Sequence, residues 1–309
     1  MLFFFVLFAA MFLAVGLTLR FFENRMLYYP EPLPEGYLSE LAGGLAESAW
    51  DEVAIATEDG ETISGWYGRP DEPRAHLLWF HGNAGNVSHR WFDLRRFVTD
   101  ERLAVLIIDY RGYGRSTGRP HEAGLYLDAR AAWDWLVARG VPEREIVVLG
   151  RSIGGSVATE LATARPVPAL ILESTFLSIG EMAKAVFPWF PASWFAKSDF
   201  PTDGRIGALD IPILLFHGES DEIVPFSHGT RLAGLAKPGQ LTFVPVPGAG
   251  HNDLGAFLGD DYFRRVSRFI DAAVPGSGDL GRDNDRSEWR GRRRFDGRFG
   301  RRGLRRGLG

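Results

Sequence analysis

Two serines of the chain lie in the pattern Gly-x-Ser-x-Gly, which is typical of nucleophilic serines at a turn between a strand and a helix. They are Ser116 and Ser152. Only Ser152 has the required context, because the strand-like residues 145–150 precede it and a helical pattern over 153–164 follows it. Ser116 lies in a loop rich in glycine and arginine. We therefore predict that Ser152 is a catalytic nucleophile. The alternative is a serine that only caps a helix.

A nucleophilic serine needs a base to remove its proton and an acid to orient that base. In a doubly wound sheet, such partners lie on loops at the carboxyl ends of later strands. Asp221 follows the apolar run 211–217, and His251 lies in a glycine-rich loop after the last apolar run. Of the seven histidines, only His251 both follows the candidate acid and lies on a loop at a strand end. We predict Asp221 as the acid and His251 as the base, with Glu219 and Glu222 as rival carboxylates.

The elements that must position these residues alternate along the chain between residues 50 and 274. Short apolar runs predict strands, and segments with helical periodicity lie between them. Such alternation favours an α/β fold with a mostly parallel central sheet covered by helices on both faces. The predicted strands are 52–57, 62–68, 75–80, 103–109, 145–150, 167–173, 211–217 and 240–246, and the clearest helices are 122–139, 153–164 and 253–273.

The order Ser152, Asp221, His251 along the chain is the order found in α/β-hydrolases. Over about residues 20–274 the chain resembles that superfamily, and it is similar to a branch of small membrane-anchored serine hydrolases that includes protein depalmitoylases. The stretches that carry the resemblance are 80–86 (FHGNAGN), 109–118 (DYRGYGRSTG), 150–154 (GRSIG), 217–225 (HGESDEIVP) and 250–252 (GHN). The cysteine-rich, lipidated N-terminus of the depalmitoylases is absent, since the chain has no cysteine.

An oxyanion hole needs two preorganised N–H donors near the nucleophile. In this fold the residue after the nucleophile supplies one of them from its backbone, and that residue is Ile153. The resemblance implies that the backbone N–H of Asn83 is the other. An ordinary tight turn at His81-Gly82-Asn83 is the alternative.

The first 19 residues carry no charge and include five phenylalanines. As a helix they would extend roughly 28 Å, about the thickness of a bilayer core. We predict a transmembrane anchor over 1–19 and a linker over 20–49. A cleaved signal peptide, with Ala14-Val15-Gly16 as the cleavage site, is the alternative, although no basic residue precedes the run. Arg20 and Arg25 follow the run, so the positive-inside rule places the body on the cytoplasmic side.

Two further segments stand apart from the predicted hydrolase domain over 50–274. Residues 174–209 are too long for a simple connection and carry seven aromatic side chains. They predict a cap that forms an apolar acyl pocket or contacts the bilayer, unless its aromatic residues only pack on the body.

Residues 275–309 are rich in glycine and arginine, which predicts disorder. The net charge is +6 over 276–309 and −10 over the rest of the chain. Anionic lipid or RNA is a candidate partner for this tail, and a solvated tail without a partner is the alternative.

These features predict a serine hydrolase that cleaves a carboxylic ester or thioester through an acyl-enzyme. An acyl or lipid-like substrate suits the aromatic cap and the apolar first 19 residues. We expect no metal or organic cofactor, and the absence of cysteine excludes thiolate catalysis. Two alternatives remain open at this stage: a serine peptidase of related fold, and a membrane-tethered binding protein that uses its basic tail.

Overall fold

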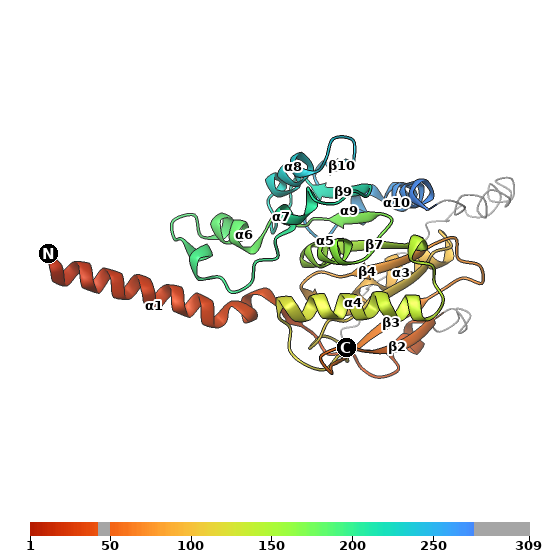
Figure 1. Ribbon diagram of the computed structural model, residues 1–309, viewed down its shortest axis with the longest axis horizontal. Coiled ribbons are helices and arrows are strands. Elements are labelled where there is room, and N and C mark those ends of the chain that lie inside the picture. The colour runs from red at the N-terminus through yellow and green to blue at the C-terminus, as the bar shows by residue number, and fades with distance from the viewer. Residues whose placement is uncertain (43–49, 275–309) are drawn as a thin grey trace, which may run out of the picture.

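The centre of the body is an eight-stranded sheet (Figure 1). The computed structural model describes residues 1–42 and 50–274, so residues 43–49 and the predicted tail 275–309 lie outside the described residues. The strand order is β10-β9-β8-β7-β4-β6-β3-β2. Strand β3 is antiparallel to both of its neighbours, and the other pairs in this sheet are parallel, as predicted. The strands are β2 (Trp50–Ala56), β3 (Thr62–Gly68), β4 (His76–Phe80), β6 (Ala104–Ile108), β7 (Ile146–Arg151), β8 (Leu170–Glu173), β9 (Ile213–Gly218) and β10 (Leu241–Val246).

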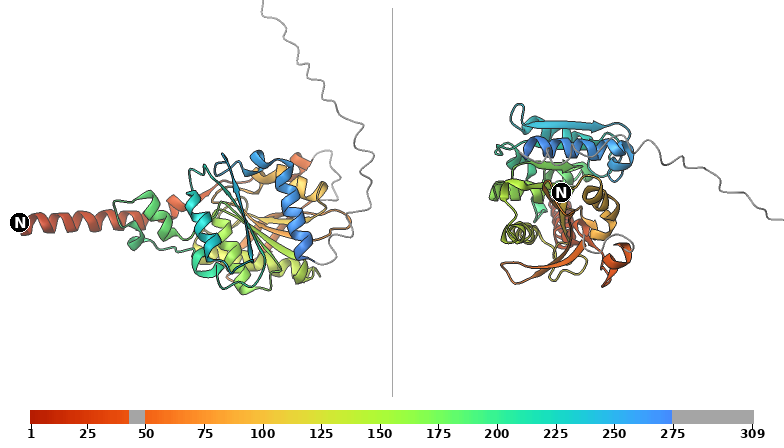
Figure 2. Two further views of the ribbon diagram at one scale, coloured as in Figure 1. Left: turned by 90° about the horizontal axis from the view of Figure 1, so that it is seen from above. Right: turned by 90° about the vertical axis from the view of Figure 1, so that its right-hand side faces the viewer.

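Helices cover both faces of this sheet (Figure 2). The predicted helix over 253–273 is divided into two at Gly259, whose φ of +55° breaks the helical geometry. The helices are α1 (Leu2–Leu27), α2 (Tyr37–Ala42), α3 (Trp91–Thr99), α4 (Glu122–Ala138), α5 (Ile153–Ala164), α6 (Ile179–Val186), α7 (Thr202–Ile206), α8 (Phe226–Leu235), α9 (Leu254–Leu258) and α10 (Asp260–Ala273).

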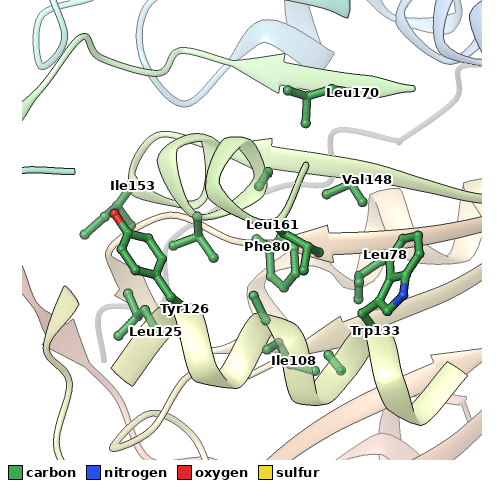
Figure 3. Packing of buried hydrophobic residues seen from close by; sticks show 14 of the residues in the cluster. Leu78, Phe80, Ile108, Leu125, Tyr126, Trp133, Val148, Ile153, Leu161 and Leu170 are labelled. Atoms are coloured by element: carbon green, nitrogen blue, oxygen red, sulfur yellow. The ribbon is translucent and has the colours of Figure 1, made fainter. Parts of the chain in front are cut away.

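Strand β4 shows why the central strands are continuous apolar runs. Leu78 and Phe80 pack in the layer of α4 and α5 (Figure 3), whereas Leu77 and Trp79 pack in the opposite layer with α3 and α10. A parallel strand that is buried on both faces needs apolar residues at every position. The sheet is thereby fixed between two hydrophobic layers, and its carboxyl edge carries the loops predicted to hold the site.

The N-terminal segment differs from the expected anchor and linker. Helix α1 continues to Leu27, eight residues beyond the predicted end of the apolar run. The short strand β1 (Tyr29–Pro30) then pairs with β5 (Ala84–Gly85), so residues 20–42 pack on the body instead of forming a simple linker. The rest of α1 projects away from the sheet (Figures 1 and 2). The helix is long and apolar enough to cross a membrane, a test that a signal sequence also passes.

The predicted cap lies between β8 and β9 and contains α6, the short 3₁₀ helix η4 (Ala192–Phe195) and α7. It lies beside α1, where the two segments contact each other (Figure 1). Its aromatic side chains are divided between two environments. Phe176 and Phe200 are buried against the body, whereas Trp189 and Trp194 are exposed. Packing on the body therefore accounts for only part of the cap aromatics.

Candidate active site

Ser152 forms a strained turn between β7 and α5. Its φ of +53° and ψ of −120° lie in a region that residues with a side chain rarely adopt. The turn is held from the end of β8, because the Ser152 N–H donates to the Glu173 carbonyl at 2.8 Å and the Thr175 hydroxyl donates to the Ser152 carbonyl at 2.8 Å. This is the strand–turn–helix geometry predicted for a nucleophile elbow.

Glycines on both sides of Ser152 allow the close packing that this turn requires. A Cβ on Gly154 would collide with the backbone of Phe80, and a Cβ on Gly150 would collide with the backbone of Gly154. The loop after β4 also approaches closely, since a Cβ on Gly82 would lie 3.6 Å from the Cβ of Ser152. Helix α5 can therefore begin directly against the sheet, with its N-terminus beside the candidate oxyanion loop.

Asp221 and His251 meet at the carboxyl edge of the sheet. The His251 Nδ1 lies 2.8 Å and 3.0 Å from the two carboxylate oxygens of Asp221. Burial of Asp221 opposes its ionisation, but the hydrogen bond from His251 and those from the Val224 and Ile223 N–H groups outweigh burial and hold the pKa of Asp221 below its ordinary value. Asp221 is therefore an ionised carboxylate that fixes the orientation of the imidazole.

The two rival carboxylates have other positions. Glu222 accepts a hydrogen bond from the backbone N–H of His251 at 3.2 Å, and so supports the loop rather than the ring. Glu219 is exposed to solvent. Of the three acidic residues in this loop, Asp221 is the one that bonds to the imidazole of His251.

Arg151 is a site residue that the sequence analysis missed. Its guanidinium donates to the carbonyl of His251 at 2.7 Å and to the side chain of Asn252 at 3.2 Å. It is buried at the end of β7, in register with the buried Glu173 of β8. Because Arg151 directly precedes Ser152, these bonds connect the elbow to the histidine loop. An arginine at the end of an otherwise apolar strand is the signal that could have revealed it.

The loop that carries Asn83 is fixed by the N-terminal segment. The carbonyl of Asn83 accepts hydrogen bonds from the Tyr29 N–H at 2.9 Å and the Tyr113 hydroxyl at 2.8 Å, and its side-chain amide donates to the Leu27 carbonyl at 3.0 Å. Neither the Asn83 N–H nor the Ile153 N–H donates to another protein group within the described parts of the chain. Both N–H groups are thus available to an oxyanion.

A cavity of about 400 Å³ brings Ser152, Ile153 and Asn83 together. Its other walls come from the C-terminal half of α1, from the cap and from the loop after Asp221, and most of them are apolar. The apolar wall residues include Leu19, Met26 and Leu27 of α1 and Phe176, Ile179, Met182, Phe187 and Phe195 of the cap. The end of α1, predicted as part of a linker, is therefore a wall of the candidate site.

The second Gly-x-Ser-x-Gly serine has a structural role. The Ser116 hydroxyl donates to the Asp109 carbonyl at 2.7 Å and accepts from the Ser64 N–H at 2.8 Å, so it ties its loop to β3. The six other histidines also have partners away from Ser152. These partners are Tyr67 for His76, the Gly82 carbonyl and Asp109 for His81, Glu31 for His89, the Gly124 N–H for His121, the Val224 carbonyl for His217 and the Leu177 N–H for His228. His217 also lies 3.5 Å from Asp221, so it packs behind the candidate acid.

The sheet order and the elbow define an α/β hydrolase, and comparisons with known proteins agree. A family model described as Hydrolase_4, serine aminopeptidase S33, matches residues 71–203. Protein bem46 of Schizosaccharomyces pombe is 35% identical over 268 residues, which cover 84% of this chain and 88% of that protein. The α/β hydrolase domain-containing protein WAV2 of Arabidopsis thaliana is 31% identical over 276 residues, covering 82% and 89%.

A solved structure of an esterase from Pyrococcus furiosus has the same fold, with a TM-score of 0.64, 20% identity, and coverage of 80% of this chain and 98% of that one. Because it is more than 30% identical to bem46 and WAV2 over most of its length, the chain belongs to the α/β-hydrolase family. The finer resemblance to membrane-anchored depalmitoylases stays a prediction. The catalytic roles of Ser152, Asp221 and His251 also stay predictions, to which the geometry above gives concrete tests.

The contact between Asp221 and His251 predicts that substitution of Asp221 lowers kcat much more than substitution of the neighbouring Glu222. Asp221→Asn should lower kcat for p-nitrophenyl butyrate about 10³–10⁴-fold, because the imidazole loses the anion that orients it. Glu222→Gln keeps an acceptor oxygen for the His251 N–H and should lower kcat less than about tenfold. Steady-state kinetics of the two variants checks this. A larger loss in Glu222→Gln would make Glu222 the catalytic acid.

The position of Arg151 predicts that its substitution lowers kcat and leaves KM nearly unchanged. Arg151→Met should lower kcat about tenfold to a hundredfold with little change in KM, because the histidine loop loses its link to the elbow. Kinetics on the same ester measures the split between kcat and KM. Arg165→Met, which removes an exposed ion pair with Asp134, is the control and should leave both constants unchanged. A tenfold to hundredfold rise in KM with an unchanged kcat would contradict a positioning role for Arg151.

Proposed function

We propose that the protein is a serine hydrolase that cleaves ester or thioester bonds of acyl or lipid-like substrates. The observation that carries this proposal is the apolar cavity whose wall includes Ser152, Ile153 and Asn83. An acyl chain that fills this cavity would have its carbonyl carbon beside the hydroxyl of Ser152. The alcohol or thiol part of the substrate would then leave on the side of His251.

The reaction would proceed through an acyl-enzyme. The Ser152 hydroxyl attacks the acyl carbonyl carbon while His251 accepts its proton, and the N–H groups of Ile153 and Asn83 stabilise the oxyanion. His251 then donates that proton to the leaving alcohol or thiol. A water molecule, deprotonated by His251, attacks the acyl-enzyme, and His251 returns that proton to the Ser152 oxygen as the bond to the carboxylic acid breaks. Asp221 stays ionised throughout and holds the Nδ1–H of His251.

The charged residues of the cavity wall are already bonded to the protein, which favours an apolar ligand. Both carboxylate oxygens of Glu23 accept hydrogen bonds from backbone N–H groups, of Lys197 at 2.5 Å and of Ser198 at 2.7 Å. The guanidinium of Arg20 donates to the carbonyls of Phe195 and Ala196 at 3.2 Å and 3.4 Å. These charges hold the cap against α1. The surface left for a ligand is mainly hydrocarbon.

A serine peptidase is the second candidate, because the matching family model is described as a serine aminopeptidase. Removing an N-terminal residue requires an acidic group that binds the substrate ammonium. Among the described residues, Glu23 is the acidic side chain that lines this cavity, and its oxygens already accept from the cap backbone. This arrangement favours acyl substrates over peptides. A tethered binding protein that uses the tail 275–309 is a proposal outside the described residues.

We also propose that α1 is retained as a single-pass anchor, with the body on the cytoplasmic side as Arg20 and Arg25 predict. The packing of Phe12 on Phe190 and Phe195 of the cap supports retention, because cleavage at Ala14-Val15-Gly16 would remove Phe12 and this contact.

The cavity predicts that kcat/KM rises with acyl length. In a series of p-nitrophenyl esters from acetate to dodecanoate, each buried CH₂ contributes up to about 0.8 kcal/mol, or roughly fourfold, until the cavity is full. Ala183→Trp, which places a large ring on the cavity wall, should abolish this rise but spare acetate. Ala185→Trp on the exposed face of the same helix is the control. Preference for acetate, or faster cleavage of an amino-acid p-nitroanilide, would contradict the proposal and favour a peptidase.

A further inference from the structure

Part of the cap is an uncharged segment exposed to the surroundings. Residues 186–196 (VFPWFPASWFA) carry no charge, and Lys184 and Lys197 lie just outside them. Within this segment the exposed fraction is 79% for Trp189, 77% for Trp194 and 58% for Val186. A cluster of exposed large apolar side chains is a mark of an interaction surface.

The same segment packs on the apolar half of α1. The ring of Phe12 lies 5.0 Å from that of Phe190 and 5.8 Å from that of Phe195. Gly16 faces the ring of Phe195 so closely that a Cβ there would overlap it. Other side chains around this part of α1 are exposed, among them Phe8, Met11 and Val15. Helix α1 and the segment 186–196 therefore form one continuous apolar surface, side by side in Figures 1 and 2.

The first charged residues after the two parts of this surface, α1 and the segment 186–196, lie at the same level along α1. Arg20, the first charged residue of α1, donates to the carbonyls of Phe195 and Ala196, directly before Lys197. One turn later, Glu23 binds the backbone N–H groups of Lys197 and Ser198. Two segments about 175 residues apart in sequence thus share one boundary. A common boundary of this kind fits a bilayer surface, where basic side chains lie at the headgroups and apolar ones lie below.

The depth of the segment also fits a single leaflet. Phe12 precedes Arg20 by eight residues, which is roughly 12 Å along a helix. The hydrocarbon core of a bilayer is about 30 Å thick, so a cap in contact with Phe12 would reach less than halfway across.

Part of the backbone of the segment needs no hydrogen bond from water. Unpaired backbone N–H groups are costly in hydrocarbon, and two of the residues, Pro188 and Pro191, have none. Internal hydrogen bonds to backbone carbonyls satisfy the N–H groups of Phe187, Phe190, Ala192 and Trp194.

We propose that the segment 186–196 inserts into one leaflet beside α1, and that acyl chains enter the cavity directly from the hydrocarbon region. The second part rests on the proposed function, and it narrows the substrate class to membrane-resident acyl esters. The cavity supports this route, because Phe187 and Phe195 of the inserted segment and Leu19 of α1 line one part of it while Ser152 lines another. A substrate would then reach Ser152 without its acyl chain crossing water.

The test uses the full chain reconstituted in phosphatidylcholine vesicles with and without brominated acyl chains. Bromine quenches tryptophan fluorescence at short range, so quenching reports which rings lie in the hydrocarbon region. The variant Trp189→Ser/Trp194→Ser is compared with wild type and with Phe92→Ser/Phe257→Ser, which changes two exposed aromatic residues on α3 and α9. Because α1 is intact in all three, the comparison reports the depth of the cap rather than attachment to the vesicle.

We expect quenching in wild type and in the phenylalanine variant, and its loss in the tryptophan variant. Turnover of a long-chain ester in the vesicle should fall about tenfold or more in the tryptophan variant, which corresponds to ~1.4 kcal/mol, while turnover of water-soluble p-nitrophenyl acetate stays the same. Equal quenching of wild type and the tryptophan variant would overturn insertion. Lost quenching with unchanged turnover of the vesicle ester would overturn entry from the bilayer. A wild type that hydrolyses neither ester would refute the proposed function, and with it this route, while quenching still decides insertion.

Discussion

The left-handed backbone conformation of Ser152 is the constraint on which the rest of the site depends. A residue with a side chain adopts it only where its surroundings compensate for the strain. Here the end of β8 supplies two hydrogen bonds to the turn, and Gly150 and Gly154 allow α5 to start directly against the sheet. The same turn directs the Ile153 N–H and the Ser152 side chain to one cavity. The elbow therefore places Ser152 at the cavity in which we propose that an acyl group binds.

The N-terminal segment couples this site to a candidate membrane helix. Leu27 and Tyr29 bind Asn83 on one side of the cavity, and Arg20 and Glu23 bind the cap on the other. Removing the end of α1 would take away one wall of the cavity and the bond between Leu27 and Asn83, and removing β1 as well would take away the bond from Tyr29. The end of α1 is therefore a structural part of the hydrolase, beside its proposed role as an anchor.

Much of the fold could be predicted from local patterns in the sequence. Continuous apolar runs such as Ala104–Ile108 indicated buried parallel strands, and the alternation with helices indicated their connections. The strand–helix context of Ser152 and the loop positions of Asp221 and His251 were also visible, because they depend on residues near in sequence. The structure places Asp221 against His251 and Ser152 in a cavity with Ile153 and Asn83, while the catalytic roles of these residues stay predictions.

What the sequence left open depends on contacts between distant residues. In the sequence, Arg151 occupies the variable position of the Gly-x-Ser-x-Gly motif. Its role depends on contact with His251, which lies 100 residues later in the chain. The pairing of Tyr29 with Ala84 turns an expected linker into part of the body. The break at Gly259 was missed because both halves of 253–273 have helical periodicity, and only the positive φ of that glycine separates them.

The most direct test of the central claim is to identify the serine that reacts. The folded protein would be treated with a fluorophosphonate and cleaved with trypsin, which separates the two candidates because Arg115 and Arg151 directly precede Ser116 and Ser152. Fragment ions distinguish Ser152 from the other serines of its peptide, which are Ser156, Ser174 and Ser178 because trypsin does not cleave between Arg165 and Pro166. The account predicts stoichiometric modification of Ser152 and none of Ser116. Modification of Ser116, or no modification of a folded sample, would contradict it.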